Sequence, residues 1–567
     1  MERDASGSVG RVIGTEDSTP LEFWVAVGPG EYLQLDDVVA CERAVPGQDA
    51  VSIYGVVSQV RARHEGARFD SDVFEIVDAR LPGEVSEAAQ VTSTRFNPEI
   101  FVPPTPGSEV RRAAGKERDT ALFFDDMEAK LPAGLSRDGE PIWVGLEFLD
   151  GSRGAHVNIS GISGVATKTT YATFLLYSLF HSGALGADAV NTKALVFNVK
   201  GEDLLFLDHA NNALPLEESE RYALLGLPVG PFGSVAVFAP PRRGSAAGVP
   251  DVASRPTGVT SFFWTLAEFC REELLPFLFA DAEDDRQQYT IVVQSVVTHL
   301  TREAQPLPDG GVRFHDPHTD ESVSIRTFRD LVEFVNAKVE DEDSGWAGRA
   351  ISSGTVGAFV RRLNAAVRHV EHLIRGDVPN AASHRVSLDR QVTVVDLHNL
   401  NDRAKRFVVG VVVRREFERK EQTGTSRPLL FLVLDELNKY APREGSSPIK
   451  EMLLDVAERG RSLGVILIGA EQTASEVERR VIANSAVRVV GRLDSAEAVR
   501  DEYGFLPGTL RQRTTILKPG SMVLSQPQIP VPLLAEFPFP AWATRASEAG
   551  GIPGAHGSGD PFDGMPR

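Results

Sequence analysis

The feature that most constrains the fold of this chain is a set of short, almost continuously apolar runs separated by longer helical patterns. The runs are HVNISG (156–161), ALVFNV (194–199), VTVVDL (392–397), LLFLVLD (429–435), GVILIGA (464–470) and VRVVGRL (487–493). Runs rich in Val, Ile and Leu suit strands that are buried on both faces, as in a parallel sheet covered by helices. The alternation of such strands with helices predicts an α/β core over residues 120–545.

The rest of the chain divides into regions of different composition, as expected for 567 residues, which are too many for one hydrophobic core. Residues 1–96 contain short β-type runs between Gly, Pro and Asp turns, a pattern that predicts a small β-barrel. Residues 97–119 are rich in proline and charge and are predicted to be a linker. Residues 546–567 are rich in glycine with few large apolar side chains, so we expect a disordered tail.

One interval inside the core, between residues 199 and 392, is too long for a single crossover between neighbouring strands. Amphipathic helical patterns fill most of it, which predicts an inserted helical bundle over residues 255–385. The last pattern has apolar residues on one face at Val360, Leu363, Val367, Val370 and Ile374. Its arginines, which we interpret as a solvated bundle face rather than a DNA contact, are Arg361, Arg362, Arg368 and Arg375.

Charge and cysteine content narrow the class of protein. A formal net charge of −20 argues against a surface that coats nucleic acid, although it does not exclude a local basic channel. Cys41 and Cys270 lie far apart and lack partner His or Cys spacing, so neither a disulfide framework nor a zinc site is expected. The start of the sequence has no apolar signal region, and no run of about 18 apolar residues occurs. We therefore expect a cytoplasmic protein.

A loop rich in Gly, Ser and Thr, ISGVATKTT, follows the first of the apolar runs and opens a helical pattern. A phosphate-binding loop reads G-x-x-x-x-G-K-[ST], and alignment on Lys168 places Thr169 at the Mg²⁺ position. The two glycine positions then fall on Ile162 and Thr167, so the loop is either one residue longer than the pattern or lacks both glycines. The residues expected to surround phosphate are Gly161, Ser163, Gly164, Val165, Ala166, Thr167, Lys168, Thr169 and Thr170. The loop alone is equally compatible with a plain strand-to-helix turn that carries a solvated lysine.

Polar residues follow two later apolar runs. Asp435 and Glu436 end the run LLFLVLDE, where one carboxylate of a nucleoside triphosphatase holds Mg²⁺ and the next polarises the attacking water. An acidic pair also suits a helix N-terminus, but its position downstream of the candidate loop favours the functional interpretation. Gln472 follows the next run and is placed to orient the water. Arg459, Arg461 and Arg492 are candidates to stabilise transition-state charge, and their spacing does not distinguish among them.

In order and spacing, these motifs resemble the HerA family of hexameric DNA-translocating ATPases, within the HerA and FtsK group. The resemblance covers residues 9–545 and includes the barrel, the loop, the insertion, ALVFNVKGEDLL, FLVLDELNKYAPR, ERGRSLGVILIGAEQTAS and TTILKPGSMVLSQPQIPVPLL. It implies a RecA-like P-loop ATPase core, a barrel of the HerA and ATP-synthase type, and ATP and Mg²⁺ as cofactors. The second strand of the family usually ends in Asp, where this chain has Asn198.

The resemblance also implies roles for individual residues. Lys168 and Thr169 would hold the triphosphate and Mg²⁺, Asp435 would hold the metal, and Glu436 would be the catalytic base. Gln472 would sense the γ-phosphate. Arg461 matches the family arginine that follows the acidic pair, and Arg153 resembles the arginine that is offered to a neighbouring subunit.

The function implied is an ATP-driven double-stranded DNA translocase or helicase that forms a hexameric ring with DNA in its pore. Family members commonly work with a NurA-type nuclease in DNA end resection during double-strand break repair. One alternative is a nucleotide-binding ring scaffold with weak or no hydrolysis that organises a nuclease or an antiphage defence effector. Another is a motor of related fold that moves protein substrates.

Overall fold

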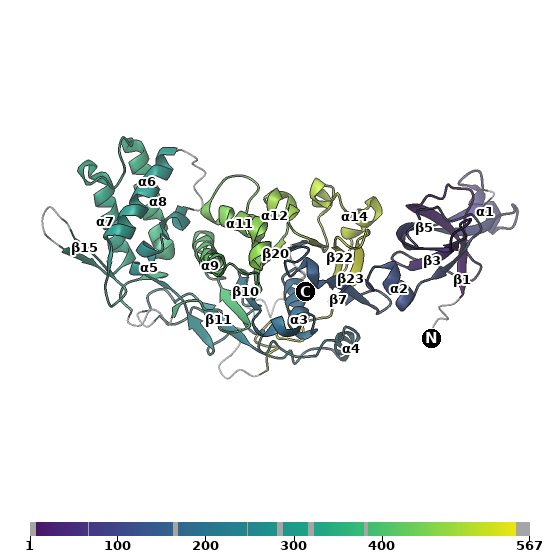
Figure 1. The fold of residues 1–567 in the computed structure, drawn as a ribbon, viewed down its shortest axis with the longest axis horizontal. Coiled ribbons are helices and arrows are strands. Elements are labelled where there is room, and N and C mark those ends of the chain that lie inside the picture. Colours follow the sequence, from purple (N-terminus) through teal and green to yellow (C-terminus); the bar gives the residue numbers. More distant parts are fainter. Residues whose placement is uncertain are drawn as a thin grey trace, which may run out of the picture. The chain divides into compact units, whose positions relative to one another are not determined.

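The computed structural model describes residues 7–65, 67–162, 168–245, 248–279, 287–315, 322–378 and 384–550 (Figure 1). The chain forms two compact units. One combines Met1–Phe148 with Val487–Phe537, and the other combines Leu149–Ala486 with Pro538–Arg567. Each unit is built from segments that are distant in sequence. No helix in the described part of the chain is long and apolar enough to cross a membrane.

The first unit contains the predicted barrel, which is closed and antiparallel in the order β1-β2-β5-β4-β3-β6. Its strands are β1 (Ser8–Val12), β2 (Glu22–Val27), β3 (Val38–Arg43), β4 (Val51–Glu65), β5 (Glu84–Asn97) and β6 (Glu109–Arg112). Alternate side chains fill the interior, among them the fully buried Val25, Val39 and Val91. The predicted linker at 97–119 therefore contains the strand that closes the barrel, followed by helix α2 (Lys116–Ala121).

The remainder of the first unit is an antiparallel arrangement in the order β21-β22-β23-β7-β8. Its strands are β7 (Lys130–Leu135), β8 (Pro141–Gly145), β21 (Val487–Val490), β22 (Ser521–Ser525) and β23 (Leu533–Glu536). Helices α13 (Ser495–Ala498) and α14 (Gly508–Thr514) lie between β21 and β22. Arg513, on α14, donates to Asp36 of the barrel over 2.7 Å. The last of the six predicted strands, VRVVGRL, is thus β21, which pairs antiparallel with β22.

The second unit is built on a parallel sheet in the order β12-β11-β18-β10-β19-β20-β9. Its strands are β9 (Val157–Ser160), β10 (Lys193–Asn198), β11 (Val235–Ala239), β12 (Val259–Ser261), β18 (Val392–Asp396), β19 (Leu430–Asp435) and β20 (Val465–Glu471). Every residue of β9, β18, β19 and β20 is buried, as their unbroken apolar sequences require. The α/β class predicted from the sequence is confirmed.

Helices α3 (Lys168–His181), α9 (Asp402–Thr423) and α11 (Pro448–Leu463) follow β9, β18 and β19 as crossovers of this sheet. Helix α11 has clear sequence signals at both ends. Ser447 accepts a hydrogen bond from the amide of Lys450, and Pro448 occupies the first helical position. Gly464 ends the helix at φ 68°, and a side chain there would collide with the carbonyl oxygen of Ser426, so only glycine fits.

The predicted insertion contains α5 (Leu266–Arg271), α6 (Gln287–Glu303), α7 (Phe328–Glu340) and α8 (Ser353–Val370). The predicted apolar stripe of α8 places Leu363, Val367 and Val370 in the interior. A small antiparallel sheet, which sequence patterns did not indicate, lies between α6 and α7. Its strands are β14 (Gln305–Pro306), β15 (Val312–His315) and β16 (Ser322–Ile325).

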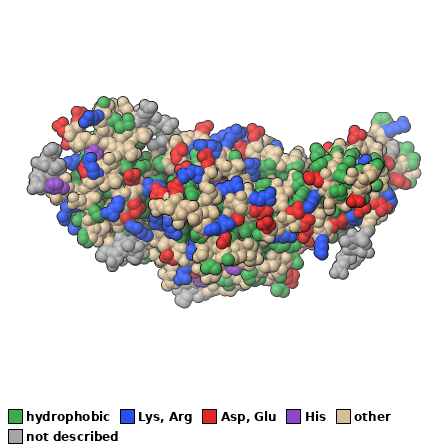
Figure 2. Space-filling model, in the orientation of Figure 1, with side chains coloured by type: hydrophobic (Ala, Val, Ile, Leu, Met, Phe, Trp, Pro, Cys, Tyr) green, Lys and Arg blue, Asp and Glu red, His purple; other side chains and the backbone are tan. Residues whose placement is uncertain are grey.

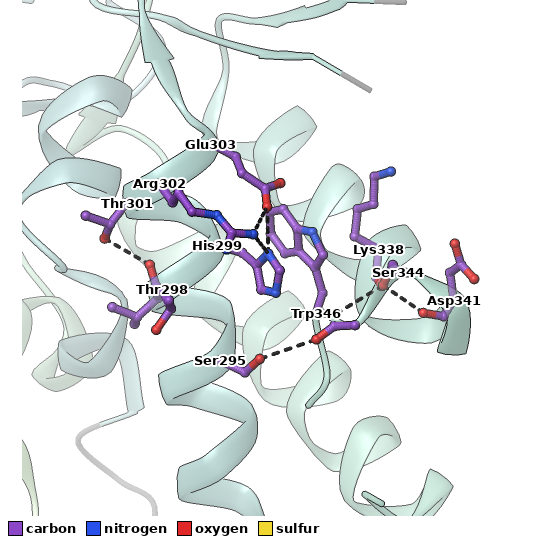
Figure 3. Close-up of polar contacts among 12 residues, drawn as sticks. Ser295, Thr298, His299, Thr301, Arg302, Glu303, Lys338, Asp341, Ser344 and Trp346 are labelled. Atoms are coloured by element: carbon purple, nitrogen blue, oxygen red, sulfur yellow. Dashed lines mark hydrogen bonds and ion pairs between the residues drawn. The ribbon is translucent and has the colours of Figure 1, made fainter. Parts of the chain in front are cut away.

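A cluster of polar and aromatic side chains joins the end of α6 to the turn that follows α7 (Figure 3). His299 stacks on Trp346 with ring centroids 5.0 Å apart, and its Nδ1 lies 2.7 Å from Oε1 of Glu303. Arg302 donates to the same carboxylate oxygen over 2.7 Å. Since Trp346 is only 2% exposed, we interpret this cluster as structural: it covers one end of the bundle core.

Candidate nucleotide-binding site

The candidate site lies at the edge of the parallel sheet where its strands end. Strand β20 lies between β9, which leads into the candidate loop, and β19, which ends in Asp435. The register pairs Ala470 with Asp435 and Glu471 with Ser160. The end of β20 is therefore flanked by Ser160 and Gly161, at the start of the loop, on one side and by the acidic pair on the other. In open α/β sheets, ligands bind at such carboxyl ends of parallel strands.

Lys168 lies at the start of α3, directly after the candidate loop. It is 5% exposed, and its Nζ donates to the carbonyl oxygen of Gly161 over 2.7 Å. Burial lowers the pKa of Lys168, while the carboxylates of Asp435 and Glu471 act in the opposite direction. Lys168 is therefore not a solvated lysine. The remaining predicted loop contacts, Ser163, Gly164, Val165, Ala166 and Thr167, lie outside the described residues.

Thr169 and Asp435, the two predicted metal ligands, are in direct contact although they lie 266 residues apart in sequence. Thr169 Oγ1 donates to Asp435 Oδ2 over 2.9 Å. Asp435 Oδ1 accepts the backbone amide of Glu436 over 2.8 Å, which fixes the orientation of the carboxylate. A hydroxyl and a carboxylate side by side are the oxygen donors that Mg²⁺ uses together with phosphate and water. The residues present therefore fit Mg²⁺. Thr170 lies one position further along the first turn of α3.

Two lysines that the sequence analysis did not select surround the acidic pair. Lys200 Nζ lies 3.6 Å from Asp435 Oδ2 and 3.2 Å from Glu436 Oε1. Lys439 Nζ lies 3.0 Å from Glu436 Oε2. Burial acts to raise the pKa of Glu436, but Lys439 and Lys200 outweigh it and the pKa falls below its usual value. Glu436 is thus held as a carboxylate, the form that a base requires. Its backbone also adopts φ 56°, a strained value for a residue other than glycine.

Glu471 is the second group that sequence reasoning missed. It is fully buried at the end of β20, and its Oε1 accepts from Ser160 Oγ over 2.7 Å. Oε2 has no hydrogen-bond partner among the described residues. Burial raises the pKa of Glu471 to about 8. The available signal was a carboxylate inside the apolar run GVILIGAE. The predicted sensor, Gln472, follows at the same edge of the sheet and is half-buried.

Two of the predicted arginines, Arg461 and Arg153, lie away from the acidic pair within the second unit. Arg461 is near the end of α11, before β20 begins, so it lies at the opposite edge of the parallel sheet from Asp435. Its Nε and Nη2 donate to the carbonyl oxygens of Gly151 and Ser152 over 3.0 and 2.6 Å. Arg153, which is exposed, follows on that loop. Action of either arginine in hydrolysis therefore stays a prediction that requires the site of a neighbouring subunit.

Asn198 ends β10, at the position where the family that the sequence resembles usually has Asp. Its Nδ2 donates to Asp396 Oδ1 and to the carbonyl oxygen of Gly201, both over 2.8 Å. Asp396, at the end of β18, is 0% exposed and also lies 2.8 Å from Nδ1 of His398. A carboxylate at position 198 would face the buried carboxylate of Asp396 and be repelled by it, whereas the amide of Asn198 donates a hydrogen bond to it.

No protein-family model matches the chain, and no curated protein sequence matches it. Among solved structures, VirB4 of Thermoanaerobacter pseudethanolicus is 16% identical, with a TM-score of 0.45, 72% of this chain covered and 96% of that chain covered. The plasmid coupling protein TrwB in complex with ADP and Mg²⁺ is 11% identical, with a TM-score of 0.43 and coverage of 76% and 95%. The genome packaging NTPase B204 of Sulfolobus turreted icosahedral virus 2 is 14% identical, with a TM-score of 0.21 and coverage of 26% and 68%.

Proposed function

We propose that the protein binds Mg²⁺–ATP at the edge of its parallel sheet and hydrolyses it. The observation that carries the proposal is the hydrogen bond between Thr169 and Asp435, which joins the end of the candidate loop to the acidic strand. Lys168, buried beside the same loop, supplies the positive charge that a triphosphate requires. A lysine, a hydroxyl residue and an aspartate each have a defined role in phosphoryl transfer, whereas a turn with only a structural role does not require this combination.

In this proposal, different residues bind the phosphates, hold the cation and activate the attacking water. Lys168 and the loop amides bind and orient the phosphates, while Thr169 and Asp435 hold the cation. When bound, Mg²⁺ neutralises charge on the phosphate oxygens. Glu436, held as a carboxylate, accepts the proton of the attacking water. Gln472, at the end of the intervening strand, orients that water.

We further propose that ATP hydrolysis drives translocation of double-stranded DNA through a homohexameric ring. The order of motifs and the N-terminal barrel support this proposal through the resemblance to the HerA family. The placement of Arg153 and Arg461 away from the acidic pair of their own subunit supports action across a subunit interface. Figure 2 shows acidic and basic side chains interspersed over the visible face, in keeping with DNA contact by local segments rather than a broad basic surface. A NurA-type nuclease acting in end resection is the proposed partner.

The alternative functions differ in what stimulates hydrolysis. A ring scaffold that organises a nuclease or defence effector would bind Mg²⁺–ATP and turn it over slowly or not at all. A motor for protein substrates would respond to unfolded polypeptide. The presence of Asp435, Glu436 and Gln472 favours an active enzyme over a scaffold, since a site without turnover has no chemical need for all three.

The test is phosphate release by the purified full-length chain with no polymer, linear duplex DNA, single-stranded DNA or an unfolded polypeptide. We expect stimulation by duplex DNA that falls steeply as salt is raised. Glu436→Gln is the control for contaminating ATPases. Failure of the parent protein to bind Mg²⁺–ATP in calorimetry would refute the enzyme proposal. Hydrolysis stimulated by polypeptide but not by DNA would replace the DNA motor with the protein motor.

The ring has its own test, which uses two inactive variants. Subunits carrying Arg153→Ala keep an intact Glu436, and subunits carrying Glu436→Gln keep an intact Arg153. If Arg153 acts across the interface, mixing the two should restore part of the hydrolysis, because some interfaces then combine both intact groups. Arg461→Ala in place of Arg153→Ala distinguishes the two arginines. No recovery at any mixing ratio, with ring formation intact, would exclude Arg153 from this role.

A further inference from the structure

Lys200 lies in the run ALVFNVKGEDLL, directly after strand β10, and its ammonium group reaches both carboxylates of the acidic pair. It lies on the turn after β10, the neighbour of β19 in the sheet. This turn is held in place rather than loosely exposed. Asn198 Nδ2 donates to the carbonyl oxygen of Gly201 over 2.8 Å, and Glu202 accepts the amides of Ala253 and Ser254 over 3.1 and 2.9 Å. The lysine is therefore carried to the site by a fixed backbone.

The Lys200 ammonium group lies near an oxygen of each carboxylate of the acidic pair. Asp435 Oδ2 already accepts the hydroxyl of Thr169, and Glu436 Oε2 already pairs with Lys439. Lys200 Nζ lies 3.6 Å from the same Asp435 Oδ2 and 3.2 Å from the other oxygen of Glu436, Oε1. A single positive charge is thus shared between the two carboxylates that border the Mg²⁺ position.

We propose that Lys200 is a built-in counter-ion that makes metal binding depend on nucleotide. This inference rests on the proposed ATP site. Two adjacent carboxylates attract a hard divalent cation, whereas an ammonium group between them repels it. The triphosphate adds the negative charge and the oxygen ligands that overcome this repulsion, so metal enters together with ATP. Lys200 acts through Asp435 and Glu436 and is a positioning residue rather than a catalytic one.

The test measures binding of Mn²⁺, as a probe for Mg²⁺, to the full-length protein without nucleotide, by electron paramagnetic resonance of the free ion. Lys200→Met removes the charge and keeps the length of the side chain. We expect it to bind Mn²⁺ about tenfold more tightly than the parent. Lys200→Arg keeps the charge and should bind as the parent does. Lys193→Met is the matched control, because Lys193 begins the same strand β10 at the opposite edge of the sheet.

Adding Asp435→Asn to Lys200→Met should abolish the gain, which ties the extra Mn²⁺ to the acidic pair. Equal Mn²⁺ affinity in Lys200→Met and the parent, or no binding by either, overturns the proposal. A gain in Lys200→Arg equal to that in Lys200→Met also overturns it, because the effect would then not depend on charge. Mg²⁺–ATP binding by the parent is measured separately. Its failure would refute the proposed function, whereas an unchanged Mn²⁺ affinity with normal ATP binding would refute only the role of Lys200.

Discussion

Replacement of Glu471 by glutamine is expected to stabilise the protein, and by more as pH rises. The pKa of Glu471 is raised from 4.5 to about 8 because the carboxyl group is fully buried at the end of β20. Between these values the folded protein holds a proton on Glu471 that the unfolded chain has released. Since the folded state binds more protons, its free energy of unfolding falls as pH rises through this window.

The magnitude follows from the size of the shift. One pH unit inside the window changes the free energy of unfolding by about 1.4 kcal/mol per proton. Glu471 should therefore cost the parent about 3 kcal/mol between pH 5.5 and pH 7.5, and about 5 kcal/mol once pH exceeds 8. In Glu471→Gln the new side chain cannot ionise, and its amide oxygen still accepts the hydrogen bond of Ser160. The variant should match the parent near pH 5 and exceed it in stability at pH 7.5.

The assay is urea unfolding followed by tryptophan fluorescence at pH 5.5, 6.5 and 7.5. Trp264, Trp346 and Trp542 are buried in the same unit as Glu471 and report its unfolding. Glu476→Gln, which removes an exposed carboxylate shortly after β20, controls for the loss of one negative charge. A difference between Glu471→Gln and the parent that stays constant from pH 5.5 to 7.5 would refute the reasoning, because Glu471 would then carry the same charge throughout.

Lys168→Ala should abolish hydrolysis and weaken Mg²⁺–ATP binding by at least about tenfold. Glu436→Gln should lower turnover by about 10²- to 10⁴-fold and leave Mg²⁺–ATP binding intact. Calorimetry and phosphate release measure both effects, and a Lys168→Ala variant that binds and hydrolyses ATP as the parent does would show that the loop is only a turn. Burial lowers the pKa of His156 from 6.5 to about 4. The unfolded chain then binds the extra proton, so the parent should lose about 3 kcal/mol as pH falls from 6.5 to 4, and His156→Gln should lose less over the same range in urea titrations. Asn198→Asp should destabilise the protein by about 2–4 kcal/mol, because it places a carboxylate against buried Asp396. The double variant Asn198→Asp with Asp396→Asn should recover most of this loss in the same unfolding assay, and an additive result would contradict the pairing.

The buried strands were predictable because burial on both faces leaves an unbroken apolar signature. Strands β18, β19 and β20 are the runs VTVVD, LFLVLD and VILIGAE. Strands with a weaker signature were missed: β12 has three residues, and β6 is EVRR, with one apolar side chain. Strand β6 pairs with β1 and β3, which lie far away in sequence, so its pairing rather than its composition makes it a strand. The predicted barrel therefore ends at residue 96, before strand β6.

The candidate site was only partly predictable. Its motifs are local in sequence, but its contacts join strands that lie far apart in sequence. The sequence could select Thr169 and Asp435 from their motifs, and the structure joins them by a hydrogen bond. It could not select Lys200 or Glu471, because their roles depend on the order of strands in the sheet. Lys439 differs from them, since it lies three residues after Glu436 and pairs with it locally. No local pattern states that β10 lies beside β19, or that β20 separates β19 from β9. These neighbours determine which side chains share an electrostatic environment.

Asn198, at a position where the family that the sequence resembles usually has Asp, is matched by a carboxylate on the neighbouring strand. In this chain the carboxylate at that edge stands on β18, as Asp396, and the amide on β10 donates to it over 2.8 Å. The side chain of Asn198 also donates to Gly201, in the turn that carries Lys200 toward Asp435 and Glu436. An aspartate at position 198 has no hydrogen to donate to either acceptor at neutral pH. The amide of Asn198 is thus linked to the position of Lys200, and through it to the charge balance of the acidic pair.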